Sequence, residues 1–267
     1  MKKAGTVVII GRTNAGKSTL LNNLLDKKVA ITSPKPKTTK FNIEAVYEDD
    51  RGQIVFIDTP GQSDRILSLS VDLVIYLIDR TRKRGEEENK TLGIVRRFKN
   101  IPKILVVNKI DIKKPDYNVQ YLFLEDEFEK AIEISAIKRI NLKGLLNLIF
   151  SYLPERKRIV DTNNLQTPLL NMDSKTYIAE QIREKIFLFM GQEIPYHVSV
   201  QIEELSERKN GVLYVKACLL TDRQQYKEML IGRKGRKIKQ IGSVARKELE
   251  LTRDKKVYLD LTVEVGN

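Results

Sequence analysis

The sequence has 267 residues, which is long enough for two domains, and its 31% of charged residues excludes a fibrous or membrane-embedded chain. Its single cysteine, Cys218, excludes an internal disulfide, and its single histidine, His197, excludes a multi-histidine metal site. The net charge of +13 favours a polyanionic partner, such as nucleic acid or an anionic membrane surface. Without a signal-peptide pattern, we expect a cytoplasmic protein, with peripheral association at the cytoplasmic face of the inner membrane as the alternative location.

The first 153 residues alternate between strand-like and helix-like patterns, which is typical of an α/β domain. Short continuous apolar runs predict strands that are buried on both faces of a sheet. We expect strands at residues 7–10, 41–46, 53–58, 73–78, 104–107 and near 134, and helices at 20–25, 85–98 and 142–153. The sequence therefore predicts one domain over residues 1–153.

A polar segment at residues 154–173 is expected to be a linker, and the order of elements changes after it. The patterns predict a helix at 176–190, strands at 198–204 and 212–220, helices at 223–231 and 236–251, and a last strand at 256–263. This order predicts a separate, smaller α+β domain over residues 174–267.

The nine residues from Gly11 to Thr19, GRTNAGKST, lie between a predicted strand and a predicted helix. In that context the pattern predicts a phosphate-binding loop, whose backbone N–H groups and helix N-terminus attract an anion. We expect Lys17 to reach the terminal phosphates during catalysis and the Ser18 hydroxyl to bind Mg²⁺. The predicted phosphate-binding set is Gly11, Arg12, Thr13, Asn14, Ala15, Gly16, Lys17, Ser18 and Thr19. The alternative is a chance glycine-rich turn.

Two further segments are expected near the phosphates. Asp58, Thr59, Pro60 and Gly61 follow a predicted strand, where the Asp58 carboxylate can hold Mg²⁺ and the Gly61 N–H can contact the terminal phosphate. In the polar loop at residues 35–39, Thr39 is the expected Mg²⁺ ligand, with Thr38 as the alternative, because such loops order around the terminal phosphate. A solvated polar loop with no such role is the other interpretation.

If the phosphates belong to a nucleotide, its base is expected to lie at the end of another predicted strand. The residues there are Asn108, Lys109, Ile110 and Asp111. The Asp111 carboxylate can accept hydrogen bonds from guanine N1–H and the exocyclic amine. Adenine offers no such pair of donors, so an unpaired carboxylate would reject it. The dipeptide of Ser135 and Ala136 is expected to supply the second wall of the base pocket.

A basic turn, Gly232-Arg233-Lys234-Gly235, lies between two predicted helices of the second domain. Residues 222–247 contain nine Lys or Arg against two acidic residues. The turn at residues 232–235, between two helices, has the pattern of the GXXG loop of a KH domain, which clamps single-stranded nucleic acid. The predicted RNA-binding set is Ile231, Gly232, Arg233, Lys234, Gly235, Arg236, Lys237 and Lys239, with Ile231, Ile238 and Ile241 as the groove floor. The alternative is a solvated helical hairpin.

The segments GRTNAGKSTLLN, SPKPKTTK, DTPG, NKID and ISA, in this order, resemble the Era family of bacterial GTPases. The segments IREKIFLFMGQEIPYHVSVQIEEL and MLIGRKGRKIKQIG resemble the KH domain of that family. The resemblance implies a doubly wound P-loop GTPase domain followed by a smaller α+β type II KH domain. It also implies Mg²⁺-dependent hydrolysis of GTP to GDP and phosphate. The implied partner is the small ribosomal subunit, through RNA near the 3′ end of 16S rRNA. The segments also match a wider group of GTPases that contains the tRNA-modifying GTPase MnmE and the double-GTPase Der. Asn14 matches an asparagine that helps bind K⁺ in that group, which implies activation by K⁺. No stable oligomer is expected.

The sequence departs from the family pattern at three places. Gln62 stands where the group usually has a hydrophobic residue, and it either orients the attacking water or is a surface residue without a catalytic role. Residues 62–70 form a shorter segment than in the family, and the sequence ends at Asn267, where Era proteins usually continue. The shortened segment motivates one rival hypothesis, a nucleotide-switched RNA-binding protein without meaningful turnover. The basic surface motivates a second, a peripheral membrane protein.

Overall fold

The computed structural model describes residues 2–26, 28, 43–58, 67, 70–163, 173–191, 193–253 and 255–266. They divide into two compact units, the first ending with residue 163 and the second beginning with residue 173. Five predicted site residues lie outside the described ranges: Thr39, Thr59, Pro60, Gly61 and Gln62. Among the described helices, none is both long enough and apolar enough to cross a membrane.

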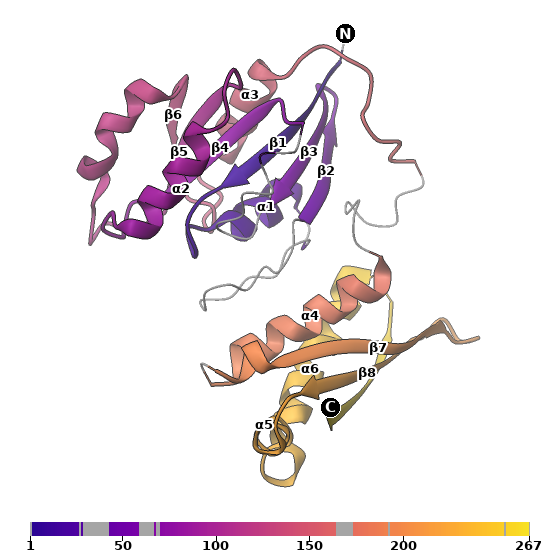
Figure 1. Ribbon diagram of the computed structural model, residues 1–267. Helices are drawn as coiled ribbons and strands as arrows, with labels where there is room; N and C mark the ends of the chain where they lie inside the picture. The colour runs from indigo at the N-terminus through magenta and orange to yellow at the C-terminus, as the bar shows by residue number, and fades with distance from the viewer. Residues whose placement is uncertain are drawn as a thin grey trace. The chain divides into compact units, whose positions relative to one another are not determined.

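The first unit is built on a six-stranded sheet with the strand order β2-β3-β1-β4-β5-β6 (Figure 1). All neighbouring strands are parallel except β2, which pairs antiparallel with β3 at one edge. The strands are β1 (Lys3–Ile10), β2 (Ile43–Asp49), β3 (Gly52–Asp58), β4 (Leu73–Asp79), β5 (Lys103–Asn108) and β6 (Lys130–Glu133). Every residue of β3 and β4 is buried, which explains their continuous apolar sequences.

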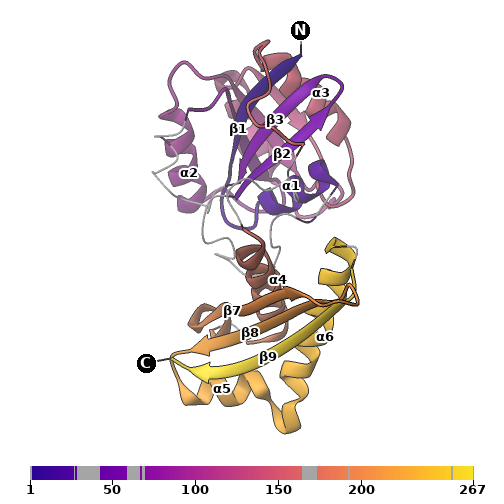
Figure 2. The same cartoon turned by 90° about the vertical axis from the view of Figure 1, so that its right-hand side faces the viewer.

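Helices cover both faces of this sheet, with α2 (Glu86–Arg96) on one face and α1 (Lys17–Leu25) and α3 (Leu142–Tyr152) on the other (Figure 2). Alternate strand residues face opposite ways, and Val8 and Ile10 of β1 share a core cluster with Leu92 of α2. A 3₁₀ stretch, η2 (Asn118–Glu127), contributes Tyr121 and Leu124 to the same cluster. The predicted doubly wound α/β fold is therefore confirmed.

The strand order reverses at β1, since the chain continues to β3 on one side and to β4 on the other. In doubly wound sheets, ligands bind at the carboxyl ends of the strands beside such a point. Residues that the sequence predicted for nucleotide binding follow β1, β5 and β6, and Asp58 ends β3.

The first part of the expected linker belongs to the first unit. The Ala4 N–H donates to the Pro154 carbonyl at 3.1 Å, and the Arg156 N–H donates to the Lys2 carbonyl at 3.2 Å. The buried Gln53 Oε1 accepts the Val160 N–H at 3.0 Å. Residues 154–163 are thus attached along the edge of this unit instead of forming a free connection.

The second unit is a three-stranded sheet of order β7-β8-β9, in which β7 and β8 are antiparallel and β8 and β9 are parallel. Helices α4, α5 and α6 cover one face of it (Figure 2). The elements are α4 (Ser174–Phe189), η3 (Ile194–His197), β7 (Val198–Glu207), β8 (Leu213–Thr221), α5 (Gln224–Ile231), η4 (Arg233–Gly235), α6 (Arg236–Arg253) and β9 (Val257–Val265). The core includes the fully buried Ile182, Ile186 and Leu249. The predicted smaller α+β fold is confirmed.

Candidate functional site

Residues 11–16 connect β1 to α1 in a conformation that requires glycine at two positions. Gly16 has φ 103°, in the left-handed region, and a Cβ built there would lie 2.4 Å from Asn108 Nδ2. A Cβ on Gly11 would lie 2.4 Å from the Leu77 carbonyl oxygen. The loop can therefore lie against the neighbouring strand ends only because both residues lack a side chain.

Lys17 folds back over this loop. Its Nζ donates to the carbonyls of Gly11 at 2.8 Å and Arg12 at 3.0 Å, and the side chain is only 8% exposed. Burial lowers the pKa of Lys17, while the carboxylates of Asp58, Glu87 and Glu88 act in the opposite direction. The ammonium group thus lies inside the loop, where an anionic phosphate would give it a stronger partner than two neutral carbonyls.

Ser18 and Asp58 lie side by side, as the sequence predicted for a metal site. The Ser18 hydroxyl donates to Asp58 Oδ2 at 2.8 Å, and Asp58 is fully buried. A hydroxyl and a carboxylate are hard oxygen ligands that suit Mg²⁺. The described residues include no cluster of three His, Cys, Asp or Glu side chains that could hold a metal. Ser18 and Asp58 could thus contribute two oxygen ligands to such an ion.

Asn108 and Lys109 hold the surrounding loops together. The buried Asn108 donates from Nδ2 to the Ala15 carbonyl at 2.8 Å and accepts the Ala136 N–H on Oδ1 at 2.9 Å. Lys109 Nζ donates to the Asn14 carbonyl at 3.0 Å and to Asp79 Oδ2 at 2.6 Å. The side chains of the first two NKID residues thus bond to the phosphate loop and its neighbours.

Asp111 and Ser135 meet although they are far apart in the sequence. Ser135 Oγ donates to Asp111 Oδ1 at 2.5 Å and accepts the Lys138 N–H at 3.1 Å. Ser135 is fully buried, whereas Asp111 is half-buried. A fixed hydroxyl therefore orients a carboxylate that still has acceptor sites for a base edge. This arrangement is compatible with the guanine hypothesis, which stays a prediction.

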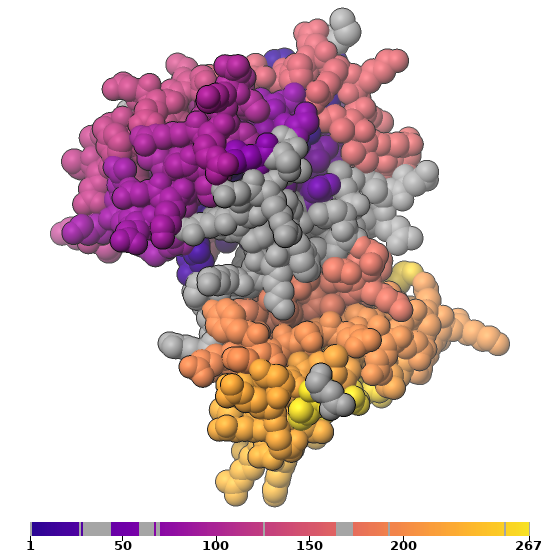
Figure 3. Space-filling model, in the orientation of Figure 1, coloured from indigo at the N-terminus to yellow at the C-terminus, as the bar shows by residue number. Residues whose placement is uncertain are grey.

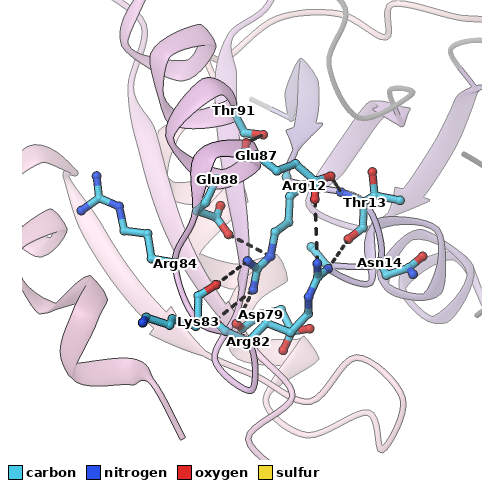
Figure 4. Close-up of polar contacts among 12 residues, drawn as sticks. Arg12, Thr13, Asn14, Asp79, Arg82, Lys83, Arg84, Glu87, Glu88 and Thr91 are labelled. Carbon is cyan, nitrogen blue, oxygen red and sulfur yellow. Dashed lines mark hydrogen bonds and ion pairs between the residues drawn. The ribbon is translucent and has the colours of Figure 1, made fainter. Parts of the chain in front are cut away.

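The side chain of Arg12 lies behind the loop, so the phosphate contact predicted for this residue would come from its backbone N–H. Its guanidinium points towards α2 (Figure 4), with Nε 3.0 Å from Glu88 Oε2. Its Nη1 and Nη2 donate to the carbonyls of Lys83 and Arg82, both at 3.0 Å. Arg12 is 3% exposed and Glu88 is 1% exposed. A guanidinium with this many fixed acceptors is not available to a phosphate, so only the Arg12 backbone belongs to the loop.

Sequence reasoning missed the carboxylates of α2 altogether. Burial raises the pKa of Glu88, although hydrogen bonds from Tyr76 and Tyr121 and the charge of Arg12 oppose it. For Glu87 burial acts in the same direction, but the Thr13 N–H bond and nearby arginines hold its pKa below the ordinary value. Three consecutive glutamates at a helix start resemble an ordinary complement to the helix dipole, so the sequence offered no distinguishing signal.

In the second unit, the turn between α5 and α6 adopts the geometry of a GXXG loop. Gly232, Lys234 and Gly235 have φ values of 68°, 53° and 70°. A Cβ on Gly232 would lie 2.7 Å from the Lys237 Cβ, so glycine is required there. The turn projects from the surface of the second unit (Figure 3), with Arg233, Lys234 and Arg236 exposed. An RNA backbone could approach this turn closely.

A groove of about 520 Å³ runs beside the turn. Four of the predicted RNA-binding residues line it, and four do not: Ile231, Lys234, Gly235 and Lys239. The lining residues are Phe189, Met190, Gly191, Ile194, Met229, Gly232, Arg233, Arg236, Lys237 and Gln240. The groove is thus apolar on the α4 side and basic on the α6 side.

The predicted groove floor of Ile231, Ile238 and Ile241 does not coincide with this groove, because none of the three lines it. Ile241 is fully buried, with Ala245 and Leu249 on the face of α6 that packs on the core. The apolar side of the groove comes instead from the end of α4 and from Met229. The helical spacing of Ile241, Ala245 and Leu249 in the sequence indicates that Ile241 faces the core. The contribution of α4 to the groove, in contrast, depends on tertiary packing.

Comparison with known proteins agrees with the division of the chain into two units. The profile of the 50S ribosome-binding GTPase family matches residues 6–109, and the KH domain profile matches residues 193–267. GTPase Era of Halothermothrix orenii is 37% identical over 278 residues, covering 98% of this chain and 93% of its own. GTPase Era of Clostridioides difficile is 36% identical, covering 99% of this chain and 94% of its own.

Two solved structures are similar over nearly the whole chain. A single-residue variant of Aquifex aeolicus Era bound to GDP.AlF4⁻ has a TM-score of 0.88 at 34% identity, covering 99% of this chain and 94% of that chain. Era in complex with MgGDPNP and nucleotides 1506–1542 of 16S ribosomal RNA has a TM-score of 0.89 at 34% identity, covering 100% of this chain and 94% of that chain. Sequence identity, coverage and fold agree, and the chain belongs to the Era family of GTPases.

Proposed function

We propose that this protein binds GTP at the carboxyl ends of the first unit's strands and hydrolyses it to GDP and phosphate. The observation that carries the proposal is the joining of three predicted motifs by side-chain bonds. Asn108 links the phosphate loop at Ala15 to the base-pocket wall at Ala136, and Ser135 orients Asp111. The segments proposed to bind the phosphates and the base are thus joined by hydrogen bonds.

Lys17 and the N-terminus of α1 would hold the phosphates, and Asp111 would read the base. Ser18, Asp58 and Thr39 would hold Mg²⁺, which neutralises charge on the phosphates when it is bound. We propose that Asn14 takes part in K⁺ binding and that Gln62 orients the attacking water. Gly61 would contact the terminal phosphate through its N–H.

Phosphate release from GTP tests this activity on the full chain, with Lys17→Ala as the matched inactive variant. We expect Mg²⁺-dependent turnover by the parent protein and none by Lys17→Ala. Turnover in KCl should exceed turnover in NaCl if K⁺ is bound. Equal release by parent and variant would mean that the activity arises elsewhere, and binding without turnover would favour the pure switch hypothesis.

We further propose that the second unit binds single-stranded RNA and that the RNA is the 3′ end of 16S rRNA, during assembly of the small ribosomal subunit in the cytoplasm. The basic turn at residues 232–235 and the apolar groove beside it support RNA binding, because bases can stack on the apolar side while phosphates meet Arg233 and Arg236. The related Era structure that holds nucleotides 1506–1542 supports the choice of RNA.

Crosslinking in cells followed by sequencing of the bound RNA tests the second proposal. We expect reads concentrated at the 3′ end of 16S rRNA. Reads spread evenly over cellular RNA would contradict the choice of partner. Flotation with vesicles of anionic phospholipid, with and without competing RNA, distinguishes membrane binding from RNA binding. We expect no flotation once RNA occupies the basic surface.

A further inference from the structure

Two side chains from the β4–α2 region hold one residue of the phosphate loop from behind. Glu87 Oε1 accepts the Thr13 N–H at 2.7 Å, and Arg82 Nη1 donates to the Thr13 carbonyl at 2.7 Å (Figure 4). Both polar backbone groups of Thr13 are therefore engaged by charged partners, and such hydrogen bonds are roughly twice as strong as those between neutral groups.

This arrangement determines how the next peptide group points. The Thr13 carbonyl and the Asn14 N–H belong to one planar trans peptide, so they point in opposite directions. Holding the carbonyl towards the Arg82 guanidinium turns the Asn14 N–H away from that guanidinium. Asn14 also has φ 64°, in the left-handed region, which asparagine adopts more readily than most residues with a side chain.

The two holding residues are themselves fixed by the loop that they hold. Arg12 donates to the Arg82 carbonyl at 3.0 Å and pairs with the buried Glu88, next to Glu87. Tyr76 of β4 donates to Glu88 Oε1 at 2.5 Å. The start of α2 and the phosphate loop thus form a closed set of bonds, anchored in the core of the first unit.

We infer that Glu87 and Arg82 are positioning residues for nucleotide binding, which hold the Thr13–Asn14 peptide in one orientation before the phosphates arrive. The inference rests on the proposed function. Charge supports the pairing, because Arg82 Nη2 lies 3.8 Å from Glu87 Oε2 and compensates a carboxylate that would otherwise repel phosphate. Glu87 acts as a hydrogen-bond acceptor, and Arg82 acts as donor and counter-charge.

Four variants of the full chain test this inference by their affinity for GDP with Mg²⁺. Glu87→Ala and Arg82→Ala remove the bonds to Thr13, and we expect each to weaken binding about tenfold, since ordering one backbone residue costs roughly that factor. Glu87→Gln keeps an acceptor, and Arg82→Lys keeps a cationic donor. Both should bind within about threefold of the parent protein.

Exposed neighbours provide matched controls, because Glu86→Ala and Lys83→Ala remove similar charges from the same turn and should bind like the parent protein. The midpoint of thermal unfolding is measured for every variant without nucleotide. A purely structural role predicts a fall in this midpoint with little change in affinity. A positioning role predicts a loss of affinity with little change in the midpoint.

Parent-like affinity of Glu87→Ala would overturn the inference. So would tighter binding by both Glu87→Ala and Glu87→Gln, since Glu87 would then act only as a repelling charge. Failure of the parent protein to bind GDP would overturn the proposed function first, and this outcome is distinguishable because it precedes any comparison of variants.

Discussion

Replacing Asp111 by asparagine tests how the base is read, because Ser135 determines which atom the new side chain presents. In the parent protein, Ser135 Oγ donates to Asp111 Oδ1 at 2.5 Å. Only the carbonyl oxygen of an asparagine can accept this bond, so its NH₂ group takes the place of Oδ2. A donor then faces the N1–H and amine donors of guanine.

The magnitude follows from the bonds that are lost. A hydrogen bond to a charged group contributes about 1.5–3 kcal/mol, and guanine would make two to the carboxylate. Because Asp111 is half-buried, the lower value applies to each bond. The expected loss of GDP affinity is about 3 kcal/mol, roughly 150-fold. Xanthosine diphosphate has a carbonyl in place of the amine and should gain affinity.

Equilibrium titration with fluorescent GDP and xanthosine diphosphate measures both affinities. Asp126→Asn removes an exposed carboxylate and is the control for charge alone. In the double variant Asp111→Asn, Ser135→Ala, the amide is free to turn, so the preference for xanthine should shrink. Unchanged GDP affinity in Asp111→Asn would refute the reasoning, and an equal preference with and without Ser135 would refute the role of the hydroxyl.

Three other variants test separate parts of the molecule. Gly16→Ala should lower the free energy of unfolding by about 1–2 kcal/mol, because φ at this position is 103°. Gly93→Ala, in the exposed middle of α2, should raise the free energy of unfolding by about 1 kcal/mol. Urea denaturation measures both changes. Arg233→Asp with Lys234→Asp should abolish RNA binding in anisotropy titrations, where parent affinity should fall with salt at roughly −0.7 per phosphate contacted. Gln62→Leu should slow single-turnover hydrolysis more than about tenfold, or ~1.4 kcal/mol of barrier, with GTP affinity nearly unchanged.

Each of these predictions has an outcome that contradicts it. Equal effects of the two glycine substitutions would show that the backbone conformation at Gly16 is unimportant. For the RNA, Lys90→Asp with Lys143→Asp changes the net charge equally at exposed positions of the first unit, and an equal loss there would deny the turn its role. Parent-rate hydrolysis by Gln62→Leu would make that residue a bystander.

The sequence allowed both folds to be predicted, because their signals are local. The apolar runs at 73–78 and 104–107 are wholly buried strands, and the break at Gly232 coincides with a left-handed φ of 68° between two helices. The phosphate loop was equally accessible, since its glycines, lysine and serine lie within the nine consecutive residues from Gly11 to Thr19. Each of these features depends on residues that are adjacent in the chain.

Long-range partners could not be predicted in the same way. Arg12 belongs to the loop by sequence, but its guanidinium finds Glu88, which is 76 positions later, only after α2 packs on the sheet. The apolar side of the RNA groove likewise comes from Phe189 and Ile194, far from the GXXG turn in the chain. A motif fixes the backbone of a site, while tertiary packing decides where its longer side chains point.

Asn108 shows how tightly these levels are connected. One side-chain amide uses its NH₂ group on the phosphate loop and its oxygen on the base-pocket wall. Lys109 adds a bond to Asn14, the same residue whose N–H direction depends on Arg82. The loop is therefore held from two sides, by the NKID segment and by α2. Since base and phosphate contacts share this frame, their contributions to nucleotide affinity are not independent, and substitutions in the two segments should combine non-additively.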